Sequence, residues 1–169
     1  MPDKSTLRKA KEDLREGKSA STAAGEFVHE EVEHVREGKH GARSPKQAIA
    51  IGLSKARRAG IPLPPPEKGK AKESTRRSAA GAYRRGQAKS EDKPSPRASR
   101  ARKAVLEREP RNTASHSALS KQSRTASSQR SKSDRQSAAR KAVRTKGKAG
   151  VRAAAKKGAQ TRARSRKSS

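Results

Sequence analysis

The sequence contains no cysteine and no tryptophan, and it has a single phenylalanine and a single tyrosine among 169 residues. Without cysteine the chain can form no disulfide bond, thiolate metal site or cysteine nucleophile, which fits a reducing compartment. Proteins that bind single-stranded nucleic acid stack the bases on aromatic rings, and this chain offers almost none. These absences remove several classes of enzyme and of nucleic-acid-binding protein.

Apolar residues are also scarce. They make up 28% of the chain, whereas average soluble domains have about 45–50% on a slightly broader count. The longest apolar run, AIAIGL at residues 48–53, is far shorter than the roughly 20 residues that span a membrane. The first residues have no apolar segment typical of a secretory signal. We therefore expect a soluble, cytoplasmic chain that does not bind membranes.

Charge is distributed unevenly along the chain, whose formal net charge is +29. Residues 1–60 have 13 Lys and Arg against 9 Asp and Glu, a net of +4, whereas residues 61–169 have 32 against 7, a net of +25. Leu, Ile, Val and Phe follow the opposite trend, with nine before residue 61 and seven after it. The composition predicts a folded module over 1–60 and a polycationic tail.

The apolar spacing of the first 60 residues predicts three helices, over about 6–16, 21–37 and 44–59. Ser44 is a good N-cap and Pro45 suits the first position of the third helix. The second and third helices should form a hairpin over about 21–59. Its predicted core consists of Val28, Val32, Val35, Ile49 and Leu53. This core is small, so marginal stability or self-association is expected.

The stretch GIPLPPPEKGK separates the module from the tail. Consecutive prolines end a helix, so residues 61–70 should form an extended linker. Residues 71–169 have too few apolar side chains to offset the entropy of ordering, which predicts a largely disordered tail. Alanine-rich segments inside it should become short helices on a polyanion, at about 99–109, 115–127, 137–144 and 151–161. The expected fold class is therefore mostly α.

Histidines offer the only catalytic candidates, and none has convincing partners. In HEEVEH, His29 and His34 are five residues apart, about 140° around a helix, so the sequence does not fit the H-E-x-x-H zinc-protease motif. Glu31 and His34 form an E-x-x-H pair, but di-metal bundles need a second such helix. His40 lies between two glycines without an Asp or Ser pattern near it. We expect solvated side chains, no enzyme activity, no metal and no cofactor.

The tail carries the strongest functional signal. Residues 110–169 have 18 basic residues and one acid. Such a segment needs a polyanion, and without aromatics or base-reading motifs the expected partner is duplex DNA, bound through its phosphates without sequence preference. The predicted nucleic-acid-binding residues are Arg97, Arg100, Arg102, Lys103, Arg140, Lys141, Arg144, Lys146, Lys148, Arg152, Lys156, Lys157, Arg162, Arg164, Arg166 and Lys167.

Residues 36–60, REGKHGARSPKQAIAIGLSKARRAG, resemble the hallmark of a bacterial family of small basic proteins classed as a domain of unknown function. The resemblance implies a bacterial source and a helical hairpin, and it implies no activity. The tail is similar in composition to the Lys- and Ala-rich tails of bacterial histone H1-like proteins.

Together these observations predict a non-enzymatic, histone-like protein associated with the nucleoid, whose N-terminal hairpin self-associates or binds a protein partner. Two alternatives stay open. The chain is an RNA- or ribosome-associated basic protein, or it is a protein-interaction module whose basic tail only localises it.

Overall fold

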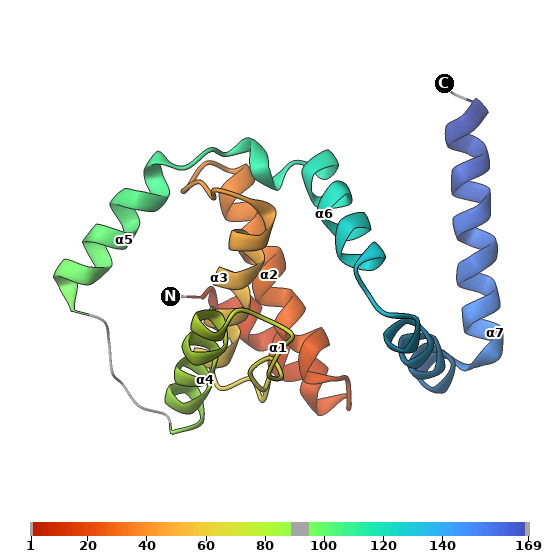
Figure 1. Cartoon of the computed structure of the whole chain (residues 1–169), viewed down its shortest axis with the longest axis horizontal. Coiled ribbons are helices and arrows are strands. Elements are labelled where there is room, and N and C mark those ends of the chain that lie inside the picture. The colour runs from red at the N-terminus through yellow and green to blue at the C-terminus, as the bar shows by residue number, and fades with distance from the viewer. Residues whose placement is uncertain (1, 89–94, 168–169) are drawn as a thin grey trace. The chain divides into compact units, whose positions relative to one another are not determined.

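The computed structural model describes residues 2–88 and 95–167, with side chains described as far as Arg164. This part of the chain is all-helical and contains no strand (Figure 1). The elements are α1 (Lys4–Arg15), α2 (Ala20–Arg36), α3 (Pro45–Arg58), α4 (Glu73–Gln87), α5 (Pro96–Arg108), the short 3-10 helix η1 (Asn112–Ala114), α6 (His116–Ser128) and α7 (Lys132–Lys167). Contacts divide the chain into two compact units, Met1–Gln122 and Ser123–Ser169.

The first three helices start and stop where local sequence signals predict, within one or two residues. The Ser44 side chain accepts a hydrogen bond from the backbone N–H of Gln47, and Pro45 occupies the first turn of α3. Helices α1, α2 and α3 each end two residues before a glycine with positive φ, at Gly17, Gly38 and Gly60. Glycine adopts this left-handed conformation without steric cost, so each helix stops abruptly and the chain reverses.

Helix α3 packs against both α2 and α4, and α1 packs against α2. The approach of α2 and α3 is close at Gly52, because a Cβ built there would lie 2.7 Å from Val28 Cα and 2.8 Å from the Phe27 carbonyl oxygen. These are backbone atoms, which cannot turn aside as a side chain can. The hairpin is therefore held together by backbone-to-backbone contact as well as by side chains.

The buried core is built mainly from alanine: nine of the thirteen buried hydrophobic residues in the described part are Ala. One cluster surrounds Phe27, which is fully buried, and includes Ile61 from beyond α3. A second cluster joins the end of α2, the start of α3 and η1. Of the predicted hairpin core, Val32 and Val35 are buried, whereas Val28, Ile49 and Leu53 are half-buried.

The proline-rich stretch after α3 has no regular secondary structure up to residue 67, and it contacts the module. Ile61 is 3% exposed, and the Arg57 guanidinium donates hydrogen bonds to the carbonyl oxygens of Leu63 and Pro64. Helix α4 then returns onto α3, which the composition of this segment does not predict. Its Gly86 permits this return, because a Cβ there would collide with the carbonyl oxygen of Arg57.

A second part of the expected tail also contacts the folded module. The backbone N–H groups of Gly41 and Ala42 donate to the carbonyl oxygens of Leu106 and Pro110, at 2.8 and 3.0 Å. The Arg36 side chain donates to the carbonyl oxygen of Ala114 at 2.9 Å. The segment from the end of α5 to η1 therefore holds the loop between α2 and α3 in place.

The largely disordered tail expected from composition is not what the structure has. Helices α5 and α6 and the two arms of α7 cover the segments in which short inducible helices were predicted. Alanine, arginine, lysine and glutamine all favour helix. Acid–base pairs one turn apart add local support, as between Glu73 and Arg76 or Lys103 and Glu107. Neither α5 nor α6 has a buried residue, so local preference accounts for them more than packing does.

The close approach at Gly52 leads to a direct test. Gly52→Ala should lower the free energy of unfolding by about 1–3 kcal/mol, because the added methyl forces α2 and α3 apart. Urea denaturation followed by the fluorescence of Tyr83, the single tyrosine, would measure the change.

Gly25→Ala is the matched control, since Gly25 lies on the exposed side of α2 and a Cβ added there would have nothing within 4 Å. It should stabilise the chain by up to about 1 kcal/mol, as helix propensity predicts. Equal effects of the two substitutions would contradict the close packing at Gly52.

Candidate functional site

The predicted nucleic-acid-binding residues lie on exposed helical surface. Arg97, Arg100, Arg102 and Lys103 are on α5, and the remaining twelve, from Arg140 onward, are on α7. All of those with described side chains, as far as Arg164, are exposed. Arg166 and Lys167 belong to α7, but their side chains lie outside the described residues.

Helix α7 consists of two arms that meet at Gly147, where φ is 69° and ψ is 165° (Figure 1). In the second arm, Lys148, Arg152 and Lys156 follow a four-residue spacing along one face. Arg162 lies on the same face, whereas Lys157 and Arg164 lie on the opposite side of the arm, roughly 160–180° around the helix from Lys148, because each residue turns the helix by about 100°. Positive charge therefore occupies two opposite sides of the arm instead of forming one stripe.

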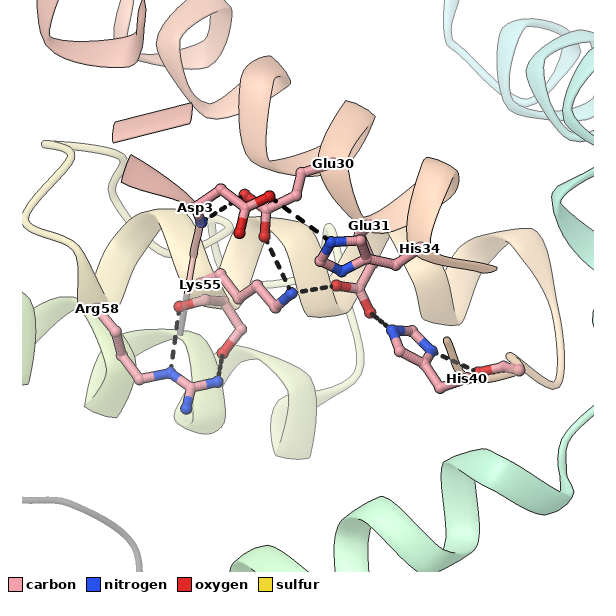
Figure 2. Close-up of polar contacts among 9 residues, drawn as sticks. Asp3, Glu30, Glu31, His34, His40, Lys55 and Arg58 are labelled. Atoms are coloured by element: carbon pink, nitrogen blue, oxygen red, sulfur yellow. Dashed lines mark hydrogen bonds and ion pairs between the residues drawn. The ribbon is translucent and has the colours of Figure 1, made fainter. Parts of the chain in front are cut away.

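The first unit contains a basic cluster that the sequence did not reveal. Arg58 comes from the last turn of α3, Arg85 from α4 and Arg102 from α5. The Arg58 guanidinium is held by hydrogen bonds to the Ser54 carbonyl and hydroxyl oxygens, at 3.3 and 2.9 Å (Figure 2). Its side chain remains accessible to solvent, yet partial burial and the charges of Arg85 and Arg102 lower the pKa of Arg58.

Gly86 explains why Arg85 lies near enough to Arg58 to affect its pKa. The residue next to Arg85 allows α4 to touch the C-terminal end of α3, and the Gln87 side chain donates to the carbonyl oxygen of Gly60 at 3.3 Å. Three like charges drawn together repel each other, so an anion bound among them would lower their energy.

A separate ionic cluster lies between α2, α3 and the loop that joins them (Figure 2). Glu31 is fully buried, with Lys55 Nζ 2.6 Å from one carboxylate oxygen and His40 Nε2 3.2 Å from the other. Lys55 Nζ also lies 3.4 Å from Glu30. The backbone N–H of Asp3 donates to the other oxygen of Glu30 at 3.1 Å.

Two members of this cluster have displaced pKa values. Burial by itself raises the pKa of Glu30, but the Thr6 hydroxyl, the Asp3 N–H and Lys55 together bring it below its usual range. Burial lowers the pKa of His34, and the positive charges of Lys55 and Lys39 lower it further. Both shifts therefore depend on how α2 is enclosed by its neighbours.

The structure corrects the expectation that these side chains are solvated. The helix spacing places Glu30 and Glu31 on the outer face of the second helix, but both are buried. His40, which lacked a partner in the sequence, faces Glu31, and its ring meets that of His34 edge to face, with centroids 6.1 Å apart. His29 is exposed as expected. The partners of Glu31 come from the loop after α2 and from α3, so no spacing within a single helix identifies them.

Two groups in the described part of the chain have ligand atoms close enough together to hold a metal ion. One is Glu31 with His34 and His40, and the other is Asp3 with Glu30 and His34. In each group the ligand atoms lie within 4.8 Å of one another.

Comparisons with known proteins place only the N-terminal part of the chain. Residues 4–69 match the model of a family of unknown function, DUF6496. The match runs from the start of α1 through α3 and the proline-rich stretch. It supports the resemblance to a domain of unknown function. No curated protein and no solved structure matches the chain. None of the described helices is long and apolar enough to cross a membrane.

The buried Glu31–Lys55 pair should be strongly coupled. Lys55→Met keeps most of the aliphatic stem but leaves the Glu31 charge poorly compensated in a site where its side chain is 1% exposed. Removing one partner of a buried pair costs about 3–5 kcal/mol, and because Lys55 is 20% exposed we expect the lower end of that range. Urea denaturation of the full chain would measure the loss.

The double substitution Lys55→Met with Glu31→Gln removes both charges and should be less destabilised than Lys55→Met alone. If the losses of stability in Lys55→Met and in Glu31→Gln alone add up to the loss in the double substitution, the two side chains do not interact energetically.

The lowered pKa of His34 predicts that stability depends on pH. Below its usual pKa of 6.5 the unfolded chain binds a proton at this histidine more readily than the folded chain does. The free energy of unfolding should therefore fall as the pH drops through 6.5. Denaturation curves at pH 7.5 and about 5.5 would detect the change, and His34→Gln should reduce it.

Glu30 gives a separate pH window. Its stabilising charge is lost only as the pH falls below the usual value of 4.5, so that decline should persist in the His34→Gln variant. A pH profile unchanged by His34→Gln would contradict the assignment of the upper window.

Proposed function

We propose that this protein binds duplex nucleic acid, in the first place DNA, through its phosphates and without sequence preference, as a histone-like component of the bacterial nucleoid. It acts by binding and not by catalysis. The N-terminal module has a second function, which is to bind either another copy of the chain or a protein partner.

The observation that carries the proposal is the exposed positive charge of the helices after the linker. Residues 61–169 have a net charge of +25, and every described side chain of the sixteen predicted binding residues is exposed. Lysine and arginine on such a surface displace the counterions condensed on duplex phosphates, which drives sequence-independent binding. The scarcity of aromatic side chains disfavours recognition of unstacked bases.

The shape of the binding helices fits a backbone-following mode. The second arm of α7 rises about 1.5 Å per residue and carries charge on two opposite sides, so it has no single reading face. Base readout needs a defined set of side chains aimed at one groove. We infer that the arms of α7 contact phosphates along either side of a groove.

Binding should also complete the helices of the tail. Isolated helices of this length are marginal in water, and repulsion between neighbouring lysines and arginines weakens them further. Phosphates relieve that repulsion. In this respect the tail behaves as a segment that folds on its polyanion, although its helical preference is already built into the sequence.

The cluster of Arg58, Arg85 and Arg102 extends the interface into the first unit. Arg58 and Arg85 are positioned by the packed helices α3 and α4, whereas the α7 charges are not. A phosphate held there would fix the orientation of the module on the nucleic acid, since contacts to phosphates position a protein without specifying sequence.

The test is a salt titration of the full chain with several unrelated DNA duplexes of equal length. The logarithm of the binding constant should fall steeply with the logarithm of salt concentration, and alike for all duplexes. A variant with Arg140, Lys141, Arg144 and Lys148 changed to Gln should have a slope shallower by about 3–4 units if all four residues contact phosphates.

The matched control removes the same amount of charge elsewhere, by changing Arg8, Lys9, Lys11 and Arg15 of α1 to Gln. These residues are also exposed, so an equal loss of slope would mean that net charge alone matters. A strong preference for one duplex would overturn the proposal. Tighter binding to structured RNA than to duplex DNA at equal salt would favour the RNA-associated alternative.

The arginine cluster is tested by the same titration. Arg58→Gln with Arg85→Gln should weaken binding more than Arg77→Gln with Arg84→Gln, which removes two exposed charges from α4 alone. Equal effects of the two pairs would remove the cluster from the interface.

A further inference from the structure

The orientation of the His40 ring follows from the hydrogen bond that it makes. Its Nδ1 lies 3.0 Å from the carbonyl oxygen of Gly41, which can only accept a hydrogen bond, so Nδ1 carries a proton. In the neutral ring, Nε2 then presents a lone pair toward Glu31 Oε1 at 3.2 Å. Two hydrogen-bond acceptors at this distance repel each other unless a positive charge lies between or beside them.

The Glu31 carboxylate is incompletely satisfied. It is fully buried, and neither of its oxygens takes part in a hydrogen bond, because the contacts with Lys55 and His40 are close but lack hydrogen-bond geometry. A buried carboxylate without hydrogen bonds is costly unless it is paired or binds a metal. Glu31 is aimed at the space shared with the two histidines (Figure 2).

His34 completes the arrangement from the same helix as Glu31, three residues farther on. The ligand atoms of Glu31, His34 and His40 lie within 4.8 Å of one another, and the two imidazole rings are edge to face. We propose that these three side chains form a binding site for a divalent transition-metal ion, with Zn²⁺ as the best match. Two histidines and a glutamate are a donor set that zinc accepts, with bonds of about 2.0–2.2 Å and a fourth position left for water.

The surroundings of His40 suit a ligand. Ligating histidines commonly donate their second ring N–H to a backbone carbonyl, as His40 does to Gly41. The loop is held from behind by Leu106 and Pro110, which accept hydrogen bonds from Gly41 and Ala42. His34 and His40 side chains are 15% and 16% exposed, so an ion can reach them from solvent.

Lys55 is the internal competitor for this site. Its ammonium balances Glu31 in the metal-free chain, and it has a second partner in Glu30, 3.4 Å away. A bound ion replaces the ammonium at Glu31 while Lys55 keeps its contact with Glu30. The metal then links His40, on the loop after α2, to Glu31 and His34 on α2. This role does not depend on nucleic-acid binding.

The second group, Asp3 with Glu30 and His34, is the poorer site. Asp3 is exposed, and Glu30 already accepts the Asp3 N–H and lies beside Lys55. The two groups share His34, so His40 and Asp3 distinguish them.

The experiment is a titration of the untagged full chain, freed of nucleic acid and metal, with Co²⁺ followed by its visible absorption and with Zn²⁺ by calorimetry. One ion per chain should bind, and Co²⁺ should give the intense bands of a tetrahedral site. His40→Gln should weaken binding at least roughly 10–100-fold, the loss seen even for supporting residues around metal ligands. Lys55→Met should tighten it.

The chain supplies its own controls, because His29 and His116 are the other two histidines and both are exposed. His29→Gln and His116→Gln should leave the affinity unchanged. Loss of binding in Asp3→Asn but not in His40→Gln would assign the ion to the other group and overturn the proposal. Absence of saturable one-to-one binding in the parent chain would also overturn it.

A fold defect in His40→Gln would be recognised by Tyr83 fluorescence and circular dichroism. A second measurement then decides: Zn²⁺ should raise the unfolding temperature of Lys55→Met, since an ion that binds only the folded chain stabilises it. That rise should vanish when His40→Gln is added. No rise with Zn²⁺ in Lys55→Met would count against the site.

Discussion

The close approach of helix backbones is the constraint on which the rest of the folded module depends. A chain with few large apolar residues cannot fill wide gaps between helices, and most of its buried hydrophobic residues are alanines. Gly52 lets α3 touch α2, and Gly86 lets α4 touch the end of α3. The buried area is gained by shortening the distances between helices, not by using larger side chains.

That approach also creates both polar sites of the module. With α2 and α3 in contact, Lys55 reaches Glu31 at 2.6 Å, and the short loop between the helices returns His40 to the same carboxylate. With α4 against the end of α3, Arg85 comes near Arg58. Close helix packing at a glycine thus produces a buried ion-pair cluster at one place and an accessible arginine cluster at another. The proposed metal site and the proposed phosphate site share this origin.

Several features could be predicted from residues alone because their causes are local. Ser44 and Pro45 start α3, and glycines with positive φ end α1, α2 and α3. The Ala-rich segments of the tail also lie where helices are found, although the tail was expected to be largely disordered. Composition measures how much apolar surface can be buried, and it therefore underestimated helices that depend on local preference and on acid–base pairs one turn apart.

The sequence by itself determined the all-helical class, the positions of the first three helices and the concentration of positive charge after residue 60. Each of these depends on neighbours along the chain or on a simple sum of charges. Only the tertiary structure decided that α4 and the segment ending at η1 return to the module, that Glu31 is buried, and that His40 faces it. Those outcomes depend on which residues come close in space, and a helix spacing says only which side chains share a face.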